Sequence, residues 1–200
     1  MHHLNIHSIL GNTDIYLVDQ IMKGRYAQQD LILDAGCGDG RNMHWFINTE
    51  FLIYGIDSDA ISIKEVGKKY PSLPADRLQV SAIENMKFST DFFDHIIVSA
   101  VLHFAKNSHH FFSMLEQMLR VIKPGGSIFI RMASDIGIEK YVREITEGVY
   151  LIPDGSKRFL LTRYLLSQLM EKYNITFLEE FKTVNVNDIR CMSTMMVLCP

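Results

Sequence analysis

Short apolar runs alternate with amphipathic stretches along most of the chain. Apolar runs of about four to eight residues between turn residues are typical of buried strands, and such runs lie at 31–35, 51–57, 77–83, 92–101 and 127–132. Stretches with helical spacing lie between them, at 41–48, from Ser58 to Pro71 and from Asn107 to Ile122. This alternation predicts an α/β fold in which helices cover both faces of a parallel sheet, a doubly wound architecture.

Individual residues mark the predicted helix ends. Ser58 is a good N-cap for the helix that stops before Pro71. Asn107 or Ser108 is expected to cap the next helix, and the Lys-Pro-Gly-Gly at 123–126 to stop it. The spacing predicts that the buried face of this helix contains Phe111, Leu115, Met118, Leu119 and Ile122.

The pattern becomes irregular after residue 132. Residues 133–160 contain a possible helix around 137–148 and a Pro-Asp-Gly turn, which together predict a lid inserted into the domain. A further helix is predicted from Thr162 to Tyr173, followed by strands at 176–186 and 193–199. Only six residues separate these two strands, too few for a helical crossover, so the pair is expected to be antiparallel.

The residues before the first strand also have helical spacing. Thr13 is the predicted N-cap, with Ile15, Val18 and Met22 on one side of the helix. Residues 1–30 are therefore expected to form a helical cap on a single domain that spans residues 1–200. An exposed apolar C-terminal strand would allow a homodimer.

Composition narrows the expected partners. The hydrophobic fraction of 48% suffices for one packed core, and 20 Lys and Arg against 23 Asp and Glu give a net charge of −3. No basic run is present that would follow a phosphate backbone, so no nucleic-acid partner is expected. The N-terminus has no secretory signal and no window is long enough to span a membrane, which predicts a cytoplasmic protein without a membrane partner. The three cysteines match no disulfide framework and no zinc site, so no metal is expected.

The glycine-rich stretch LDAGCGDG carries the strongest functional signal. Gly36, Gly38 and Gly40 follow a predicted strand and open a helix, where backbone can approach a ligand closely. Arg41 occupies the place of the third glycine of a dinucleotide site, and Asp34 would repel a pyrophosphate. A cationic nucleoside without phosphate would instead be attracted by that carboxylate. The loop therefore suits S-adenosylmethionine better than NAD, and a nicotinamide dehydrogenase remains as an alternative.

Five motifs in order give a family resemblance: LDAGCGDG, GIDSD, VSAIENMKF, FDHIIVSAVLHF and LRVIKPGGSIFIRM. Over residues 31–132 the chain resembles the class I S-adenosylmethionine-dependent methyltransferase family. The resemblance implies a Rossmann-like, seven-stranded sheet that is mostly parallel with an antiparallel C-terminal strand. It also implies a nucleoside cleft across the carboxyl ends of the first four strands.

Carried over position by position, the resemblance assigns a cofactor site. Asp57 ends the second strand, where a carboxylate can accept both ribose hydroxyls. The adenine is expected beside Ser58, held by the Ala82 amide and the Ile83 side chain, with Ser81 in place of the family's usual Asp. Ser99 is expected under the methionine part, which the opening loop surrounds with Asp34, Ala35, Gly36, Gly38 and Gly40. Cys37 is a small residue in the same tight turn and is counted with them.

The chemistry itself demands little of the side chains. Methyl transfer from a sulfonium depends mainly on alignment in a dry pocket, and a general base is optional. His103 is the best-placed candidate base, because it follows the fourth strand on the loop that borders the methyl group. Other candidates are Arg131 for an anionic acceptor, Arg25 for the cofactor carboxylate, and Tyr150, Lys157 or Arg158 for a lid over the acceptor.

Two functions follow from these residues. The cofactor fold occupies most of the chain and leaves 1–30 and 133–160 for the acceptor, which favours a methyltransferase that acts on a small molecule. The alternative is a catalytically silent S-adenosylmethionine-binding module with a regulatory or scaffold role. That alternative is motivated by Ser81 in place of the adenine-binding Asp and by the lack of an assured base.

Overall fold

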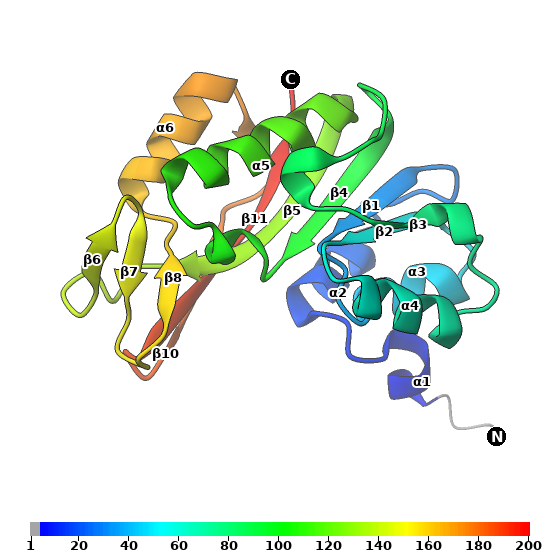
Figure 1. The fold of residues 1–200 in the computed structure, drawn as a ribbon, viewed down its shortest axis with the longest axis horizontal. Helices are drawn as coiled ribbons and strands as arrows, with labels where there is room; N and C mark the ends of the chain where they lie inside the picture. The colour runs from blue at the N-terminus through cyan, green and yellow to red at the C-terminus, as the bar shows by residue number, and fades with distance from the viewer. Residues whose placement is uncertain (1–4) are drawn as a thin grey trace.

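A twisted sheet runs through the whole molecule (Figure 1). The structure is a computed structural model that describes residues 5–200. The strands follow the order β10-β11-β5-β4-β1-β2-β3, and β9 pairs with β11 outside this path. Their bounds are β1 Leu31–Ala35, β2 Leu52–Asp57, β3 Leu78–Val80, β4 Phe93–Ser99, β5 Ile122–Ser134, β9 Thr176–Phe177, β10 Lys182–Val186 and β11 Arg190–Leu198.

The predicted sheet is confirmed, including its mixed strand directions. β1 pairs in parallel with β2 and β4, and β4 pairs in parallel with β5. β11 runs antiparallel to both β5 and β10. The main path has seven strands, as the resemblance implies. β9 is separate because the predicted strand 176–186 breaks at residues 178–181, where Glu179 forms ion pairs with Lys23 and Lys182.

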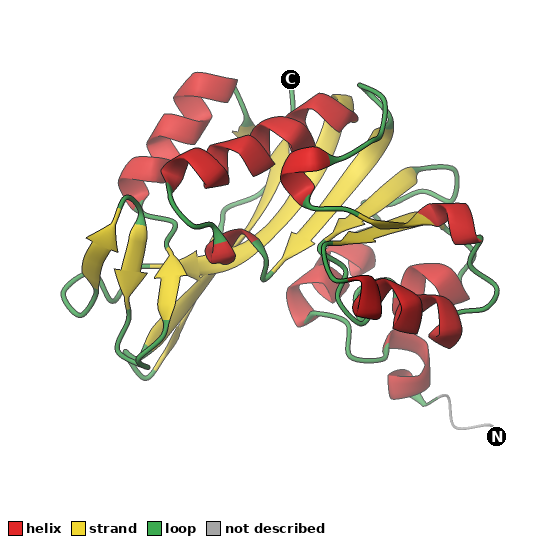
Figure 2. Cartoon of the chain, in the orientation of Figure 1, coloured by secondary structure: helices red, strands yellow, loops and turns green. Residues whose placement is uncertain are grey.

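Helices cover both faces of the sheet, as Figures 1 and 2 show. On one face α2 (Ile15–Met22), α3 (His44–Asn48) and α4 (Ala60–Lys69) contribute the buried side chains Leu17, Phe46 and Val66. On the other face lie α5 (Ser108–Val121) and α6 (Arg163–Tyr173). Successive residues of β1 point into the two cores, because side chains alternate along a strand.

The predicted face of α5 is largely confirmed. Phe111, Leu115 and Met118 are buried there, together with Met114 and Val121. Leu119 is only half-buried, and Ile122 already belongs to β5. Asn107 caps α5, as one of the two predicted positions, by accepting from the His110 amide.

Two other predicted caps are wrong by one residue. Asp59 caps α4 by accepting from the amides of Ile61 and Ser62, so the predicted Ser58 lies outside the helix. Asp14, rather than Thr13, caps α2. In both places an aspartate directly follows the predicted serine or threonine. The aspartate is the better cap, because its carboxylate also interacts with the positive end of the helix dipole.

The buried side of α2 also differs from the prediction. Ile15 and Met22 are 74% and 81% exposed. Leu17 and Gln20 are buried instead. Gln20 is satisfied there because its amide donates to Glu179 and its oxygen accepts from Arg25. A nearby arginine and a carboxylate from near the far end of the chain thus override the apolar spacing within the helix.

The helix predicted around 137–148 is wrong. The region instead forms a second, antiparallel sheet of β6 (Arg143–Thr146), β7 (Val149–Leu151) and β8 (Lys157–Phe159). Gly148 has φ 76°, and a side chain there would collide with the Phe159 ring, so a tight turn joins β6 and β7. β-branched residues on either side of that turn favour strands. The predicted turn at residues 153–155 connects β7 to β8.

The C-terminal strand is not exposed. β11 lies between β5 and β10, and its Met195, Met196 and Val197 are buried within the chain. The apolar surface that motivated a homodimer is therefore absent from this strand. No helix within residues 5–200 has the length and apolar character needed to cross a bilayer.

Candidate active site

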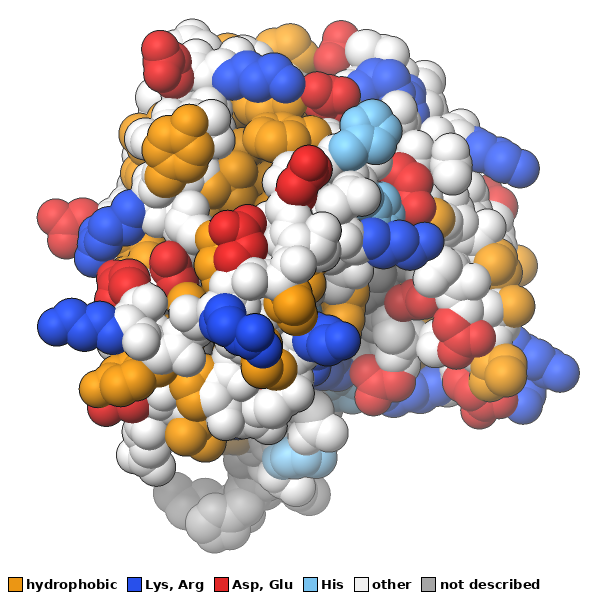
Figure 3. All heavy atoms as spheres, turned by 60° about the vertical axis from the view of Figure 1, so that its left-hand side comes forward, with side chains coloured by type: hydrophobic (Ala, Val, Ile, Leu, Met, Phe, Trp, Pro, Cys, Tyr) orange, Lys and Arg blue, Asp and Glu red, His pale blue; other side chains and the backbone are white. Residues whose placement is uncertain are grey.

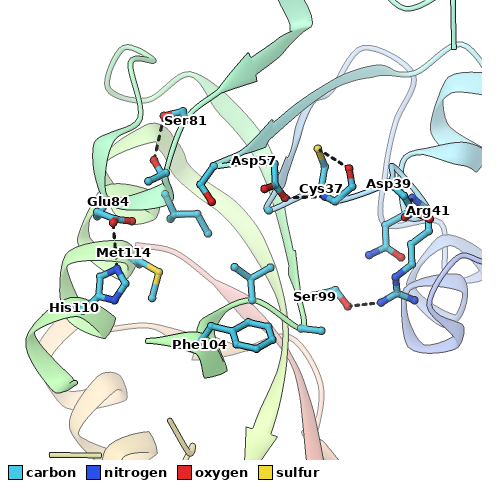
Figure 4. Close-up of a pocket in the computed structure, with 18 of the residues that line it drawn as sticks. Cys37, Asp39, Arg41, Asp57, Ser81, Glu84, Ser99, Phe104, His110 and Met114 are labelled. Atoms are coloured by element: carbon cyan, nitrogen blue, oxygen red, sulfur yellow. Dashed lines mark hydrogen bonds and ion pairs between the residues drawn. The ribbon is translucent and has the colours of Figure 1, made fainter. Parts of the chain in front are cut away.

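A cleft lies at the carboxyl ends of β1, β2, β3 and β4, where the strand order reverses around β1. Its volume is about 680 Å³, within the range of ~300–1,000 Å³ typical of ligand sites. Figure 4 shows the glycine loop on one side and the start of α5 on the other, with Asp57 and Phe104 facing each other across the space. Its remaining walls come from the residues that follow β3 and β4.

The glycine loop turns sharply at the end of β1. The amides of Gly36 and Cys37 both donate to the Ile56 carbonyl, at 2.8 and 2.9 Å. Gly36 has φ 80°, and a Cβ there would lie 2.5 Å from Val101, so no other residue fits. A Cβ on Gly38 would meet nothing within 4 Å, because this glycine borders the open cleft.

Gly40 has a different neighbourhood. Its position packs against Val66 and Tyr70, with 3.2 and 3.3 Å available to an added Cβ. It is not among the residues that line the cleft. The third glycine therefore lets α4 approach the loop, and the predicted contact of Gly40 with the cofactor stays a prediction.

Asp57 ends β2 and connects two turns of the cleft. Its Oδ2 accepts from the Gly38 amide at 2.9 Å, and its Oδ1 accepts from the Asp59 amide at 2.9 Å. Asp57 lines the cleft beside Ser58. Each carboxylate oxygen has a second lone pair, so both can still accept from a ligand hydroxyl.

Asp34 and Ala35 lie beneath the loop rather than on the cleft surface. Both are buried, and Asp34 Oδ2 has no hydrogen-bond partner among the described residues. Burial raises the pKa of Asp34 to about 7; the nearby Arg41 opposes this rise and Asp57 adds to it. Cys37 lines the cleft, but burial raises the pKa of its thiol, which therefore stays protonated and unreactive.

A buried carboxylate from the N-terminal region reaches the same end of the cleft. Asp14 Oδ2 lies 3.4 Å from the Arg131 guanidinium and 3.7 Å from that of Arg41. It also accepts from the Ser99 hydroxyl at 3.3 Å. Arg41 and Ser99 line the cleft. Two guanidiniums thus share one carboxylate beside the glycine loop.

Residues after β3 and the start of α5 form the opposite wall. Ser81, Ala82 and Ile83 line it, and their predicted contact with the adenine stays a prediction. The Ser81 hydroxyl donates to backbone carbonyls at 3.1 and 3.2 Å. His110 Nε2 lies 3.2 Å from a Glu84 carboxylate oxygen across this wall.

The chain bends abruptly after β4. Ala100 has φ 62°, a left-handed conformation that costs an alanine ~1 kcal/mol, and its amide donates to the Arg131 carbonyl at 2.7 Å. This bend directs Val101 against Gly36 and Phe104 into the cleft. Strain of this kind is frequent where a backbone must place side chains around a ligand.

His103, the predicted base, does not line the cleft. It is buried, and its Nδ1 accepts from the Ala133 amide at 3.3 Å. Burial, with the charges of Arg158 and Arg131, lowers the pKa of His103 to about 4. A catalytic role for His103 stays a prediction.

The remaining candidates are not among the residues that line the cleft. Arg25 is bound to Glu179 at 3.1 Å and is absent from the cleft lining. Tyr150 packs in a small cluster with Ile152 and Leu160. Arg158 of β8 lies over the Phe104 ring, 5.0 Å from its centroid.

Sequence reasoning missed several residues of the lining. Arg41 stood out only as an interruption of the glycine pattern, and Asp14 lay far from any motif. No periodic signal could have indicated the others, because they meet only in the fold. The missed lining residues are Asp39, Arg41, Asn42, Glu84, Ala100, Val101, Phe104, Lys106, His110 and Met114.

Comparison with known proteins agrees with this geometry. Residues 33–130 match the family model described as a methyltransferase domain. Residues 33–130 are thus a domain of the class I S-adenosylmethionine-dependent methyltransferase family, and S-adenosylmethionine is the cofactor of this family.

Two relatives are similar to this chain over only part of their own length. The uncharacterized methyltransferase YodH of Bacillus subtilis (strain 168) is 26% identical over 153 residues, which cover 74% of this chain and 53% of that protein. A tRNA (carboxymethyluridine(34)-5-O)-methyltransferase of Arabidopsis thaliana is 31% identical over 100 residues, which cover 50% of this chain and 23% of that protein. The chain therefore spans about half the length of the first relative and about a quarter of the second.

Solved structures share the fold at low identity. One is the Burkholderia thailandensis 1,6-didemethyltoxoflavin-N1-methyltransferase with bound 1,6-didemethyltoxoflavin and S-adenosylhomocysteine. It superposes with a TM-score of 0.69 and 14% identity, covering 98% of this chain and 81% of that one. At this identity the likeness extends to the fold alone.

Proposed function

We propose that this protein transfers the methyl group of S-adenosylmethionine to a small-molecule acceptor. The observation that carries the proposal is one cleft whose lining includes both the glycine loop with Asp57 and the exposed ring of Phe104. When bound, S-adenosylmethionine supplies an electrophilic methyl group on a sulfonium. The chain's own residues must orient the nucleoside and exclude water from it.

Asp57 would orient the nucleoside through its ribose. Hydrogen bonds from the Gly38 and Asp59 amides hold its carboxylate in place, so it is preorganised to accept two more from a ribose. Ser58, Ala82 and Ile83 would flank the adenine, and Gly38 would leave room for the backbone to approach the methionine part.

The arginine pair would hold the other end of the cofactor. Arg41 and Arg131 are both cationic, whereas Asp14 supplies only one negative charge between them. Among residues 5–200, no other carboxylate lies within 4.0 Å of either guanidinium. A carboxylate from the ligand would balance the charge, with Arg41 the closer partner because it lines the cleft.

The acceptor class rests on the surface and the size of the cleft. The chain has a net charge of −3, and on the face shown in Figure 3 acidic and basic side chains are interspersed rather than gathered into a basic surface. The Burkholderia structure, of the same fold, holds a small heterocycle according to its name. A second candidate acceptor is tRNA, which the name of the Arabidopsis relative specifies.

Calorimetry with S-adenosylhomocysteine tests the cofactor assignment. Asp57→Ala is expected to weaken binding about tenfold or more, because buried ribose hydroxyls lose a charged acceptor. Asp59→Ala is the matched control, since it removes a neighbouring carboxylate that caps α4 outside the cleft, and its affinity should match the parent protein. Tight binding of NAD in place of S-adenosylhomocysteine would contradict the assignment.

Turnover separates an enzyme from a silent module. The parent protein is incubated with labelled S-adenosylmethionine and a panel of thiols, amines, phenols, oxyanions and bulk tRNA. Methylation of a small acceptor supports the proposal. Methylation of tRNA alone would favour the second candidate, and persistent silence with intact cofactor binding would favour a regulatory or scaffold module.

A further inference from the structure

An exposed aromatic ring borders the mouth of the cleft. Phe104 is 61% exposed although it lines the cavity. Arg158 covers one side of the ring, with its guanidinium carbon 5.0 Å from the ring centroid. A large apolar ring held open within a ligand cavity offers a stacking surface.

The charges around Phe104 are positive. Lys106 lines the cleft two residues away, and Arg158 approaches from β8. Among residues 5–200, neither cation has a carboxylate within 4.0 Å. The acids of the lining, Asp39, Asp57 and Glu84, belong to the glycine loop, the end of β2 and the wall after β3. Beside Phe104 there are therefore two cations without a carboxylate partner among the described residues.

His103 lies next to Phe104 but does not itself line the cleft. Its ring lies 4.5 Å from the Phe104 ring, centroid to centroid. Because Nδ1 accepts from the Ala133 amide, the neutral ring carries its proton on Nε2. Such a ring donates a hydrogen bond and has no free lone pair for a proton from the acceptor.

We propose that the acceptor is a small planar organic anion, stacked on Phe104 with its negative group directed toward Arg158 and Lys106. The inference rests on the proposed methyl transfer and names the chemical class of its acceptor. An ionised acceptor atom uses its own lone pair to form the bond to the methyl carbon, while the electron pair of the broken C–S bond returns to sulfur. The acceptor loses its negative charge, the sulfonium becomes a neutral thioether, and no proton moves, so no base is required beside Phe104.

Binding of matched probes tests this class. The protein is saturated with S-adenosylhomocysteine and titrated with 2-naphthoate, a planar fluorescent anion, and with 2-naphthamide, its neutral counterpart. The carboxylate is expected to bind at least about tenfold more tightly than the amide, as a charge-assisted hydrogen bond provides. Cyclohexanecarboxylate, an anion without a planar ring, should bind more weakly than 2-naphthoate.

Two variants locate the interaction. Arg158→Gln should weaken 2-naphthoate about tenfold and reduce its advantage over the amide. Phe104→Ala should weaken both naphthyl probes by about the same factor, because it removes the stacking surface they share. Arg143→Gln is the matched control, since it removes an exposed arginine from the same small sheet and should change nothing. All three variants should bind S-adenosylhomocysteine like the parent protein, which shows that they are folded.

The outcomes distinguish this inference from the proposed function. Equal affinity for 2-naphthoate and 2-naphthamide, or an Arg158→Gln variant indistinguishable from Arg143→Gln, overturns the planar anion while leaving cofactor binding intact. Methylation of tRNA without binding of either probe overturns it as well. Failure of the parent protein to bind S-adenosylhomocysteine would instead remove the proposed function, and the inference with it.

Discussion

Asp34 combines burial with an ionisable group directly beneath the glycine loop. In the folded protein its pKa is raised to about 7, chiefly by burial. In the unfolded chain the pKa of an aspartate is ~3.9. The folded state therefore keeps a proton that the unfolded state has lost between these two values, and stability falls as pH rises from ~4 to 7. Above pH 7 both states are ionised, and this penalty stays constant.

Asp34→Asn is expected to remove that pH dependence. Asparagine has the same shape and does not titrate. The stability of the variant relative to the parent, measured as the difference between their free energies of unfolding, should therefore be higher at pH 8 than at pH 5 by more than ~1 kcal/mol. Urea unfolding at the two pH values measures it. Asp39→Asn, in the exposed part of the same loop, is the control and should show the same difference from the parent at both pH values. A pH-independent effect of Asp34→Asn would mean that the carboxyl is ionised in the fold.

At the scale of elements, the small sheet of β6, β7 and β8 is anchored at one strand. Phe159 of β8 is 1% exposed and stacks on Phe111 of α5, with centroids 4.7 Å apart. β6 is exposed along its length. The lid predicted for residues 133–160 stays a prediction, and Phe159 holds β8 to the core.

Phe159→Ala measures the anchor. Truncating a fully buried phenylalanine leaves a cavity and typically costs ~3–5 kcal/mol. The free energy of unfolding in urea should fall by that amount. Tyr164→Ala is the control, because Tyr164 is 72% exposed and its loss should cost less than ~0.5 kcal/mol. A loss below ~1 kcal/mol for Phe159→Ala would show that β8 is free to leave the core.

Elements with a strong period were predictable, and those decided by distant contacts were not. β1, α5 and α6 follow their apolar spacing closely. The region around 137–148 was misassigned because its strands are short and its turn depends on the contact between Gly148 and Phe159. The caps Asp14 and Asp59 were missed by one residue, since an adjacent hydroxyl satisfied the same rule.

At the scale of the whole molecule, an ionic network ties the first helices to the last strands. Glu179 pairs with Lys23, Arg25 and Lys182, and Lys182 also reaches Asp19. Burial opposes ionisation of Glu179, but hydrogen bonds from Lys182 and Lys23 outweigh it and hold the pKa at about 2. Because this pKa is below the unfolded value of ~4.3, the network stabilises the fold above that pH and loses its effect as pH falls toward 2.

Glu179→Gln is expected to lower the free energy of unfolding at pH 7 by on the order of 1 kcal/mol, a modest value because the lysine partners are partly exposed. The deficit should shrink at pH 3 and in ~1 M salt, where the network is titrated or screened. Urea unfolding under the three conditions gives the comparison. Glu180→Gln is the control, since this exposed neighbour has no ion pair among the described residues. A deficit that persists unchanged at pH 3 would indicate lost packing rather than lost charge.

In the cleft, too, residues within a local motif could be predicted from the sequence, whereas residues brought together by the fold could not. Gly36, Gly38 and Asp57 belong to motifs that one strand end and its turn define, so the sequence indicates them directly. Asp14 and Arg131 lie more than a hundred residues apart and meet only because α2 packs beside β5 at the end of β4. The candidate that the sequence offered for the cofactor carboxylate, Arg25, pairs instead with Glu179 and does not line the cleft.

Asp14 links the position of α2 to the release of the ligand, because it contacts both the helix and the cleft. The same side chain caps α2 and lies between the two arginines beside the glycine loop. Detachment of α2 would expose that end of the cleft to water and free both guanidiniums at once. The residence time of the nucleoside would then depend on how long α2 remains docked. The rate of deuterium uptake at the α2 amides is therefore expected to follow the rate at which the nucleoside dissociates.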